Sequence, residues 1–286
     1  QGEITRSFLS RMITRLESEQ SVKEYLDIMD HRKTEQLIDT LDKVEQNRKE
    51  CYIREFSIEH FHDSKVFETL IPKICKIFRE ENEELTGFEN EEILAEYQIY
   101  KTPGYVYMKG NVQIYSAGKQ AADISAFPEG IAVAVGSEED VPDICPDQTI
   151  DKVFTIENLT SFYRFKQEHS LVIYLGGYHN RSRRNLLMQI YQKLPDAQYY
   201  HFGDLDAGGF YILEHLKRKT GIPFQMFQMD IETLKKYEDY AKPLTENDKK
   251  RLMQLEKMEL PDEERKLITY MLQKGIKLEQ ECISES

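Results

Sequence analysis

The 286-residue sequence is 40% hydrophobic and 31% charged, a composition that is typical of folded globular domains and excludes a disordered chain. No apolar run approaches the roughly 20 residues that cross a bilayer, and no signal-peptide pattern opens the chain, so we expect a cytoplasmic protein without a membrane segment. The four cysteines are widely spaced and form no C-x-x-C pair, which argues against a zinc site and against a disulfide framework.

The formal net charge of −13 argues against a nucleic-acid partner, because phosphate binding normally requires a basic surface. The charge is unevenly distributed, however. Residues 1–150 hold 17 Lys and Arg against 30 Asp and Glu, whereas residues 151–230 hold 10 against 8. The acidity is therefore mainly N-terminal, and the middle of the chain is compatible with a phosphate ligand.

The N-terminal half predicts helices followed by a β-rich part. Residues 3–50 carry apolar side chains at three- and four-residue spacing, which predicts a helical arm or a packed helix pair. Residues 51–145 begin with a short β-like piece at 52–56 and a second helical stretch. Two β-rich runs, 104–108 and 112–115, then flank a Lys-Gly-Asn turn, which predicts a β-hairpin. Helices followed by a hairpin favour an α+β, winged-helix-like, DNA-binding module.

Strands and helices alternate from residue 150 to residue 230, after a Pro- and Asp-rich linker at 138–148. Strands at 153–156, 171–175, 198–202 and 223–227 are separated by helices at 159–167, 182–193 and 207–219. This alternation predicts an α/β domain with a parallel sheet flanked by helices. Residues 231–286 return to helical spacing and predict a C-terminal helical extension.

Three acidic residues follow two of the predicted strands. Glu157 comes directly after the strand at 153–156, and Asp204 and Asp206 come after the strand at 198–202. Ligands of a parallel sheet sit at the carboxyl ends of its strands, where these carboxylates are expected to meet. Converging carboxylates repel one another unless a cation is present, and Mg²⁺ prefers oxygen ligands. The sequence therefore predicts a magnesium site at this edge.

The structural explanation of the D-x-D pattern is that it arises by chance or caps the following helix. Gly208 and Gly209 favour the functional explanation, because they leave the start of that helix bare and let a phosphate approach it. The position of Glu157 at a second strand end favours it as well.

Three segments of this part resemble the Toprim domain shared by topoisomerases, primases and some nucleases. They read I-E-N-L-T-S-F at 156–162, Y-L-G-G-Y at 174–178 and G-D-L-D-A-G-G at 203–209. Within that group they are most similar to the JetD family, the nuclease subunits of Wadjet plasmid-defence systems, which in turn resembles the A subunit of topoisomerase VI. Stretches F-H-D-S-K at 61–65 and Y-V-Y-M-K-G at 105–110 are similar to the DNA-binding half of that family.

The resemblance implies a Toprim-type fold and a metal-dependent endonuclease subunit of an anti-plasmid defence system, which hydrolyses phosphodiester bonds of duplex plasmid DNA. Glu157, Asp204 and Asp206 are then the catalytic residues and the ligands of Mg²⁺, or of Mn²⁺ in its place. The implied partners are double-stranded DNA and SMC-type, condensin-like subunits. A homodimer would suit cleavage of both strands, because one such site cuts one strand at a time.

Four basic residues are weaker candidates near the same edge. Arg181, Arg183 and Arg184 follow the Gly-Gly turn at 176–177 and are candidates to hold DNA phosphates, although a solvated first helical turn explains them equally well. His179 is a candidate for proton transfer, while most histidines in such places are only hydrogen-bonded neighbours.

Three other functions stay open. A non-catalytic DNA-binding or assembly subunit would keep the acids for structure and use the acidic first 150 residues as a docking surface. A transesterase like the topoisomerase VI A subunit would attack with a tyrosine, but no tyrosine stands in a pattern tied to that role, so we expect water as the nucleophile. An aspartyl phosphatase would use the D-x-D pair and would not require Glu157.

Overall fold

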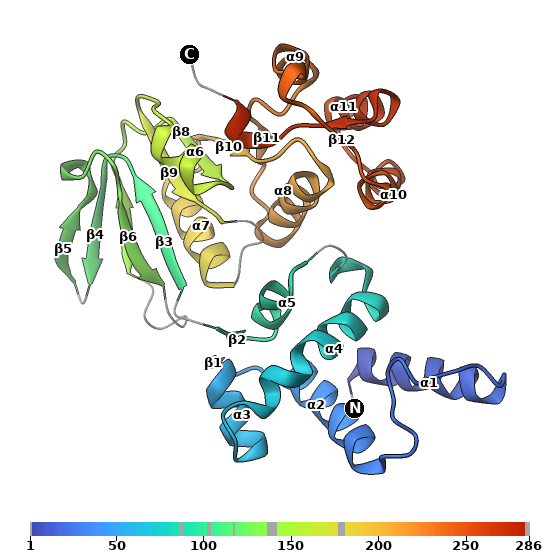
Figure 1. The fold of residues 1–286 in the computed structure, drawn as a ribbon. Helices are drawn as coiled ribbons and strands as arrows, with labels where there is room; N and C mark the ends of the chain where they lie inside the picture. Colours follow the sequence, from blue (N-terminus) through green and yellow to red (C-terminus); the bar gives the residue numbers. More distant parts are fainter. Residues whose placement is uncertain are drawn as a thin grey trace. The chain divides into compact units, whose positions relative to one another are not determined.

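The computed structural model describes residues 2–85, 88–101, 104–116, 118–135, 142–176 and 181–283. The chain divides into two compact units, residues 1–103 and residues 104–286, and each is considered by itself. The protein is mixed α/β, with helices in both units and the larger sheets in the second (Figure 1). Within the described residues, no helix is both long and apolar enough to span a membrane. The predicted winged-helix-like module, residues 51–145, falls partly in each unit and stays a prediction.

The first unit is helical and packs around fully buried aromatic side chains, among them Phe8, Phe67 and Phe78. Its helices are α1 (Glu3–Glu17), α2 (His31–Gln46), α3 (Ile53–Phe61), α4 (Val66–Glu81) and α5 (Asn90–Glu96), with the short turn η1 (Glu83–Leu85). The two-residue strands β1 (Cys51–Tyr52) and β2 (Ile99–Tyr100) pair in parallel.

The β-like piece predicted at 52–56 is wrong beyond its first residue, because α3 begins at Ile53. The Glu55 side chain accepts the backbone N–H of Tyr52 at 2.8 Å. This contact satisfies an N–H group that the first turn of a helix leaves without a partner, and it stabilises the helix start.

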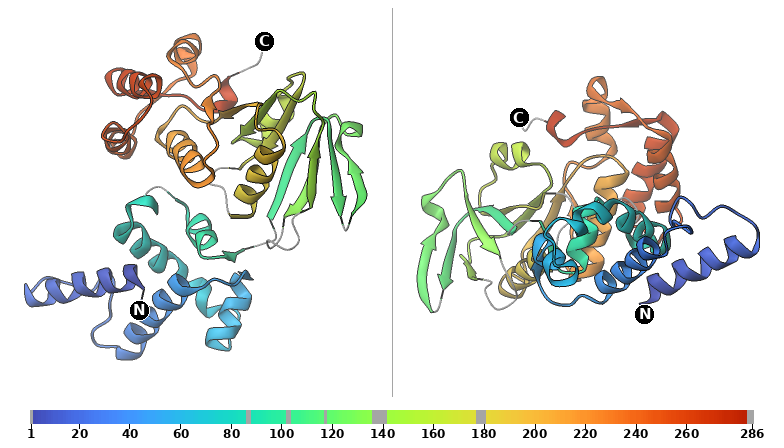
Figure 2. Two further views of the ribbon diagram at one scale, coloured as in Figure 1. Left: turned by 180° about the vertical axis from the view of Figure 1, so that it is seen from behind. Right: turned by 60° about the horizontal axis from the view of Figure 1, so that its bottom comes forward.

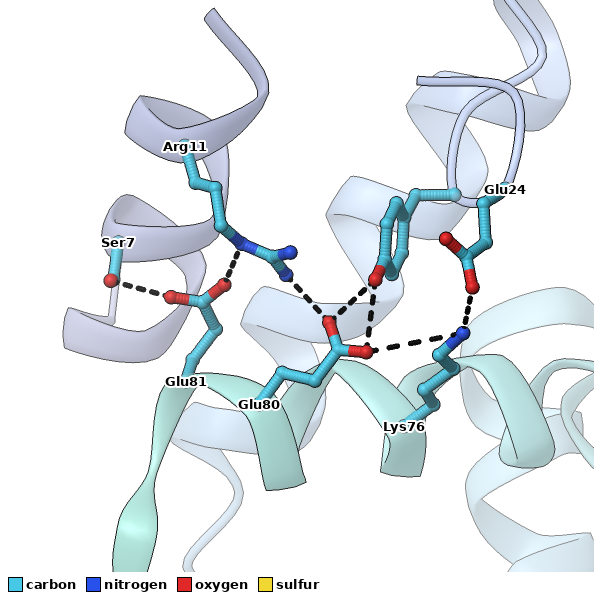
Figure 3. Close-up of polar contacts among 7 residues, drawn as sticks. Ser7, Arg11, Glu24, Lys76, Glu80 and Glu81 are labelled. Carbon is cyan, nitrogen blue, oxygen red and sulfur yellow. Dashed lines mark hydrogen bonds and ion pairs between the residues drawn. The ribbon is translucent and has the colours of Figure 1, made fainter. Parts of the chain in front are cut away.

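Polar side chains fasten α1 to α4 (Figure 3). Arg11 donates to Glu81 at 2.5 Å and to Glu80 at 2.8 Å, and Ser7 donates to Glu81 at 2.6 Å. The hydroxyl of Tyr25 donates to Glu80 as well. Helix α1 is therefore held against α4, while the choice between a helical arm and a packed helix pair for residues 3–50 stays a prediction.

The largest sheet of the second unit has the strand order β11-β10-β8-β9-β3-β6. Strands β8 (Lys152–Ile156), β9 (Ser170–Tyr174), β10 (Gln198–Phe202) and β11 (Gln225–Met226) are parallel. Strand β3 (Gly104–Lys109) pairs antiparallel with β9 and with β6 (Ile131–Val135). The helices between the parallel strands are α6 (Leu159–Arg164), α7 (Arg181–Lys193) and α8 (Ala207–Thr220). The predicted alternation and the mostly parallel sheet are confirmed.

The hairpin predicted around Gly110 is wrong. Strand β4 (Val112–Ser116) leaves the large sheet and forms a second one with β5 (Lys119–Asp123) and β7 (Asp143–Pro146), next to the short turn η2 (Ile124–Ala126). Gly110 has φ +138°, and a Cβ there would lie 2.5 Å from the Ser170 carbonyl oxygen. Glycine is needed at this position because the backbone passes so close to Ser170, and the chain turns there into another sheet.

Both faces of the parallel sheet are covered. Phe154 and Ile156 point into a core that includes residues from the C-terminal helices, while Tyr199, on the other face, packs edge-on against Tyr191 of α7 with ring centroids 5.2 Å apart. The predicted C-terminal extension contains α9 (Ile231–Lys236), η3 (Glu238–Tyr240), β12 (Lys242–Pro243), α10 (Glu246–Leu255), α11 (Asp262–Lys274), β13 (Ile276–Lys277) and η4 (Gln280–Cys282). Within this unit, the orange and red C-terminal helices lie across from the green strands, with α7 and β9 between them (Figures 1 and 2).

Candidate functional site

The acids Glu157 and Asp204 come together at the ends of neighbouring strands. In the register of β8 and β10, Ile156 lies opposite Phe202, and the backbone N–H of Glu157 donates to the Phe202 carbonyl at 3.0 Å. The side chain of Glu157 then turns across this edge, where its Oε2 accepts the backbone N–H of Asp204 at 3.3 Å. The strand ends therefore place these two residues side by side, as predicted from their positions in the sequence.

Gly203 makes room for this contact. A Cβ at Gly203 would lie 2.7 Å from Glu157 Oε2 and 2.8 Å from His201 Nε2, closer than real Cβ atoms come. The φ angle of Gly203 is not positive, so the backbone conformation alone does not require glycine. The Glu157 carboxylate and the His201 ring leave too little room for a side chain at position 203.

Asp206 holds the start of α8. It is the N-cap of the helix, and its Oδ1 accepts the backbone N–H of Gly209 at 3.0 Å. Gly209 packs so tightly on the preceding turn that a Cβ would lie 2.1 Å from the Asp204 carbonyl oxygen. Capping was the structural explanation for the second acid of the D-x-D pair, and Asp206 performs it here.

No three His, Cys, Asp or Glu side chains are grouped as ligands of a metal ion anywhere in the described ranges. Glu157 and Asp204 are adjacent, whereas Asp206 turns one oxygen into the helix cap. A site that used all three carboxylates would require Asp206 to present its second oxygen or to change rotamer. The contact that the fold supplies joins the Glu157 carboxylate to the backbone N–H of Asp204.

The Asp204 carboxyl group lies in an environment that disfavours its negative charge. Burial raises its pKa to about 6, against the lowering effect of a hydrogen bond from the Gln280 backbone N–H at 2.7 Å. The negative charges of Asp206, Glu281 and Glu279 raise the pKa further. A nearby cation would oppose both effects and favour the ionised carboxylate.

The C-terminal turn η4 completes this edge, a contribution that sequence analysis missed. Besides its bond to Asp204, Gln280 donates from Nε2 to the Phe202 carbonyl at 2.9 Å and accepts the Asn158 backbone N–H on Oε1 at 2.8 Å. The Gln280 side chain is fully buried. Just before it, Leu278 and Leu205 exchange two backbone hydrogen bonds of 3.1 and 2.9 Å. Residues from the end of the chain therefore contact both strand ends of the candidate site.

His201 lies beneath the same edge and is fully buried. Its Nδ1 lies 3.0 Å from Thr155 Oγ1, while its Nε2 has no hydrogen-bond partner among the described atoms. Burial lowers the His201 pKa to about 3, and the charge of Lys217 lowers it further, so the ring is neutral at physiological pH. His201 is thus a buried neighbour of the candidate site on β10.

The arginines at the start of α7 were predicted to hold DNA phosphates, and two of them are engaged or buried within the fold. Arg183 donates to the Leu175 carbonyl at 2.7 Å and to the Tyr105 carbonyl at 3.4 Å, so it supports the end of β9. Arg184 is only 9% exposed. The side chain of Arg181 lies outside the described part of the chain, as does the whole of His179. Phosphate binding by these arginines and proton transfer by His179 stay predictions.

The donor chemistry of the edge fits a hard divalent cation. Mg²⁺ is commonly held by only one or two carboxylates and completes its shell with water and substrate phosphates. Glu157 and Asp204 supply two carboxylates from adjacent strand ends, and a bound cation would favour the ionised form of Asp204, whose pKa burial raises. The N-terminus of α8 begins directly beside them, and backbone N–H groups at a helix N-terminus favour anions such as phosphate.

Comparison with known proteins gives a consistent result over most of the chain. Residues 139–286 match the family described as "Wadjet protein JetD, C-terminal". The chain is also 28% identical over 263 residues to the Wadjet protein JetD of Bacillus cereus (strain Q1). That alignment covers 90% of this chain and 63% of the relative, so the chain spans somewhat less than two thirds of the relative's length.

Proposed function

Since the chain belongs to the Wadjet JetD family, we propose that it is the metal-dependent endonuclease subunit of a plasmid-defence system, built on a Toprim-type domain. Its proposed substrate is duplex plasmid DNA, and its proposed partners are SMC-type, condensin-like subunits, with a homodimer suited to cutting both strands. The observation that carries the proposal is the contact between Glu157 and Asp204 at adjacent strand ends, beside the N-terminus of α8.

In the proposed mechanism the protein residues bind and orient. Glu157 and Asp204 would hold Mg²⁺, or Mn²⁺ in its place, through their carboxylate oxygens, and the cation would offset the burial and the neighbouring acids that raise the Asp204 pKa. A divalent cation held there would supply Lewis-acid chemistry, which offsets charge at the scissile phosphate and activates water as the nucleophile. The start of α8 offers backbone N–H groups to a phosphate oxygen. Asp206 keeps that helix start in place through its bond to Gly209.

The test is cleavage of closed-circular plasmid by the chain together with its SMC-type partners and Mg²⁺. We expect nicked or linear product. Glu157→Gln and Asp204→Asn should each lower its yield by more than about 100-fold, because the loss of a mere outer partner of a metal ligand already costs up to that much. Both substitutions keep the size of the side chain, and unchanged circular dichroism and melting temperature would show that the fold persists. Full activity in either variant would overturn the proposal.

Asp206→Asn separates the two roles of Asp206, because asparagine caps helices as well as aspartate does but brings no charge. If Asp206 only caps α8, as its bond to Gly209 indicates, this variant keeps both its stability and its cleavage. If Asp206 is a third ligand, the variant keeps its stability and loses cleavage. The same reactions, stopped under denaturing conditions, also test for a tyrosine transesterase, which would leave protein attached to a DNA end.

A further inference from the structure

The C-terminal turn η4 is the largest contribution to the site edge that the proposed chemistry leaves unexplained. Gln280 is fully buried, although glutamine is mostly an exposed residue. All four of its polar groups form hydrogen bonds: the backbone N–H with Asp204, the backbone carbonyl with the Ile283 N–H, the side-chain N–H with Phe202 and the side-chain oxygen with Asn158. A buried amide whose bonds are all satisfied fixes the groups around it in one arrangement.

The hydrogen-bond partners of the Gln280 side chain lie at the ends of the two strands that precede Glu157 and Asp204. Asn158 is the residue after Glu157, and Phe202 precedes Asp204 by two. The side-chain amide therefore bridges the end of β8 to the end of β10, and it adds to the hydrogen bond from the Glu157 N–H to the same Phe202 carbonyl. The bridge fixes the distance between the backbones on which the two acids stand.

The backbone N–H of Gln280 acts on the Asp204 carboxylate itself. It takes one lone pair of Oδ1 at 2.7 Å and leaves the other lone pairs of the carboxylate for other partners. A hydrogen bond of this kind selects one rotamer of a ligand before a metal arrives. Outer partners of metal ligands commonly do this, and their loss weakens metal affinity by roughly 10- to 100-fold.

We propose that Gln280 is a positioning residue, which holds Asp204 in the orientation that binds a divalent cation and keeps it at a fixed distance from Glu157. This inference rests on the proposed function, because it assumes that Glu157 and Asp204 are ligands. It assigns to the C-terminal turn a direct role in the site, so that the last helical segment of the chain and the strand ends work as one unit.

The test measures binding of Mn²⁺ alone to the 286-residue chain by electron paramagnetic resonance of the free ion. Gln280→Met keeps the length of the side chain and the backbone N–H but removes both side-chain hydrogen bonds. We expect it to weaken Mn²⁺ binding by roughly 10- to 100-fold. Gln189→Met is the matched control, because Gln189 of α7 also accepts a backbone N–H, from Ile144 at 3.0 Å, but in the smaller sheet.

The outcomes separate the inference from the proposed function. Weaker binding in Gln280→Met with binding unchanged in Gln189→Met, at similar melting temperatures, supports the inference. Equal Mn²⁺ affinity in the wild type and in Gln280→Met overturns it and leaves the metal site intact. Binding that persists unchanged in Asp204→Asn overturns the proposed ligand, and with it the basis of the inference.

A measurement on the wild type keeps the inference testable even if Gln280→Met fails to fold. Hydrogen exchange of the peptide spanning residues 276–283 should slow on addition of Mn²⁺, because the Gln280 N–H is bonded to Asp204 and an occupied site holds Asp204 in place. Exchange in this peptide that is unaffected by Mn²⁺, at concentrations that saturate the site, would overturn the role of Gln280.

Discussion

Replacing Gly209 with alanine tests the tight turn that carries Asp204 into α8. The new Cβ would lie 2.1 Å from the Asp204 carbonyl oxygen, 3.1 Å from its carbon and 3.2 Å from its nitrogen. These are backbone atoms, so the overlap is relieved only if the turn itself moves. Overpacking of this kind costs about 1–3 kcal/mol or more. For a unit of this size such a loss lowers the melting temperature by about 2–12 °C.

The sign of the effect makes Gly209→Ala decisive. Glycine to alanine within a helix ordinarily stabilises by roughly 0.5–1 kcal/mol. Gly208→Ala is the matched control one residue earlier, where the Cβ would meet only the carboxylate of the Asp206 side chain, with Oδ1 nearest at 3.0 Å. Scanning calorimetry should show Gly209→Ala melting below the wild type and Gly208→Ala near or above it. Equal melting of the two variants would refute the packing described for this turn.

Three further predictions concern stability away from the strand ends. Lys217→Met should destabilise by about 3–5 kcal/mol at pH 8, because it leaves the buried Glu264 carboxylate without its cation. Burial already raises the Glu264 pKa, so the folded state binds a proton on Glu264 more tightly than the unfolded state does. The loss of stability should therefore shrink as the pH falls and Glu264 becomes protonated. A loss that does not depend on pH between 5 and 8 would contradict this account. Phe8→Ala should cost about 3–5 kcal/mol in urea unfolding, since Phe8 is fully buried; a loss below 1 kcal/mol would show that α1 does not pack as described. Arg11→Met should cost only about 1 kcal/mol in the same assay, because the Arg11 side chain is 32% exposed and water screens its ion pairs with Glu80 and Glu81; a loss as large as that of Phe8→Ala would contradict this ranking.

The parallel part of the sheet was predictable from the sequence because it is a local pattern. Strands buried on both faces read as short apolar runs, and each is followed by a helix whose start carries its own signal. The N-cap Asn158 accepts two backbone N–H groups of α6, and the N-cap Asp206 accepts one of α8. Glu157 and Asp204 could then be placed together because the ends of adjacent parallel strands share an edge.

The misplaced elements depend on contacts between distant residues. Gly110 reads as a hairpin turn, but its close approach to Ser170 is set by a strand 60 residues later, and β4 pairs with β7 instead of β3. Gln280 shows the same limit at the site. It lies 122 residues from Asn158 and 76 from Asp204, and no spacing or turn signal connects them. Only the folded chain reveals that the C-terminal turn contacts the acidic edge.

The proposed function depends on the binding of a divalent cation by Glu157 and Asp204 together. The most direct measurement is a crystal of the protein soaked in Mn²⁺ and recorded at a wavelength where manganese scatters anomalously. We expect an anomalous peak in contact with carboxylate oxygens of both Glu157 and Asp204, beside the N-terminus of α8. A peak elsewhere in the protein, with none at this edge, would contradict it.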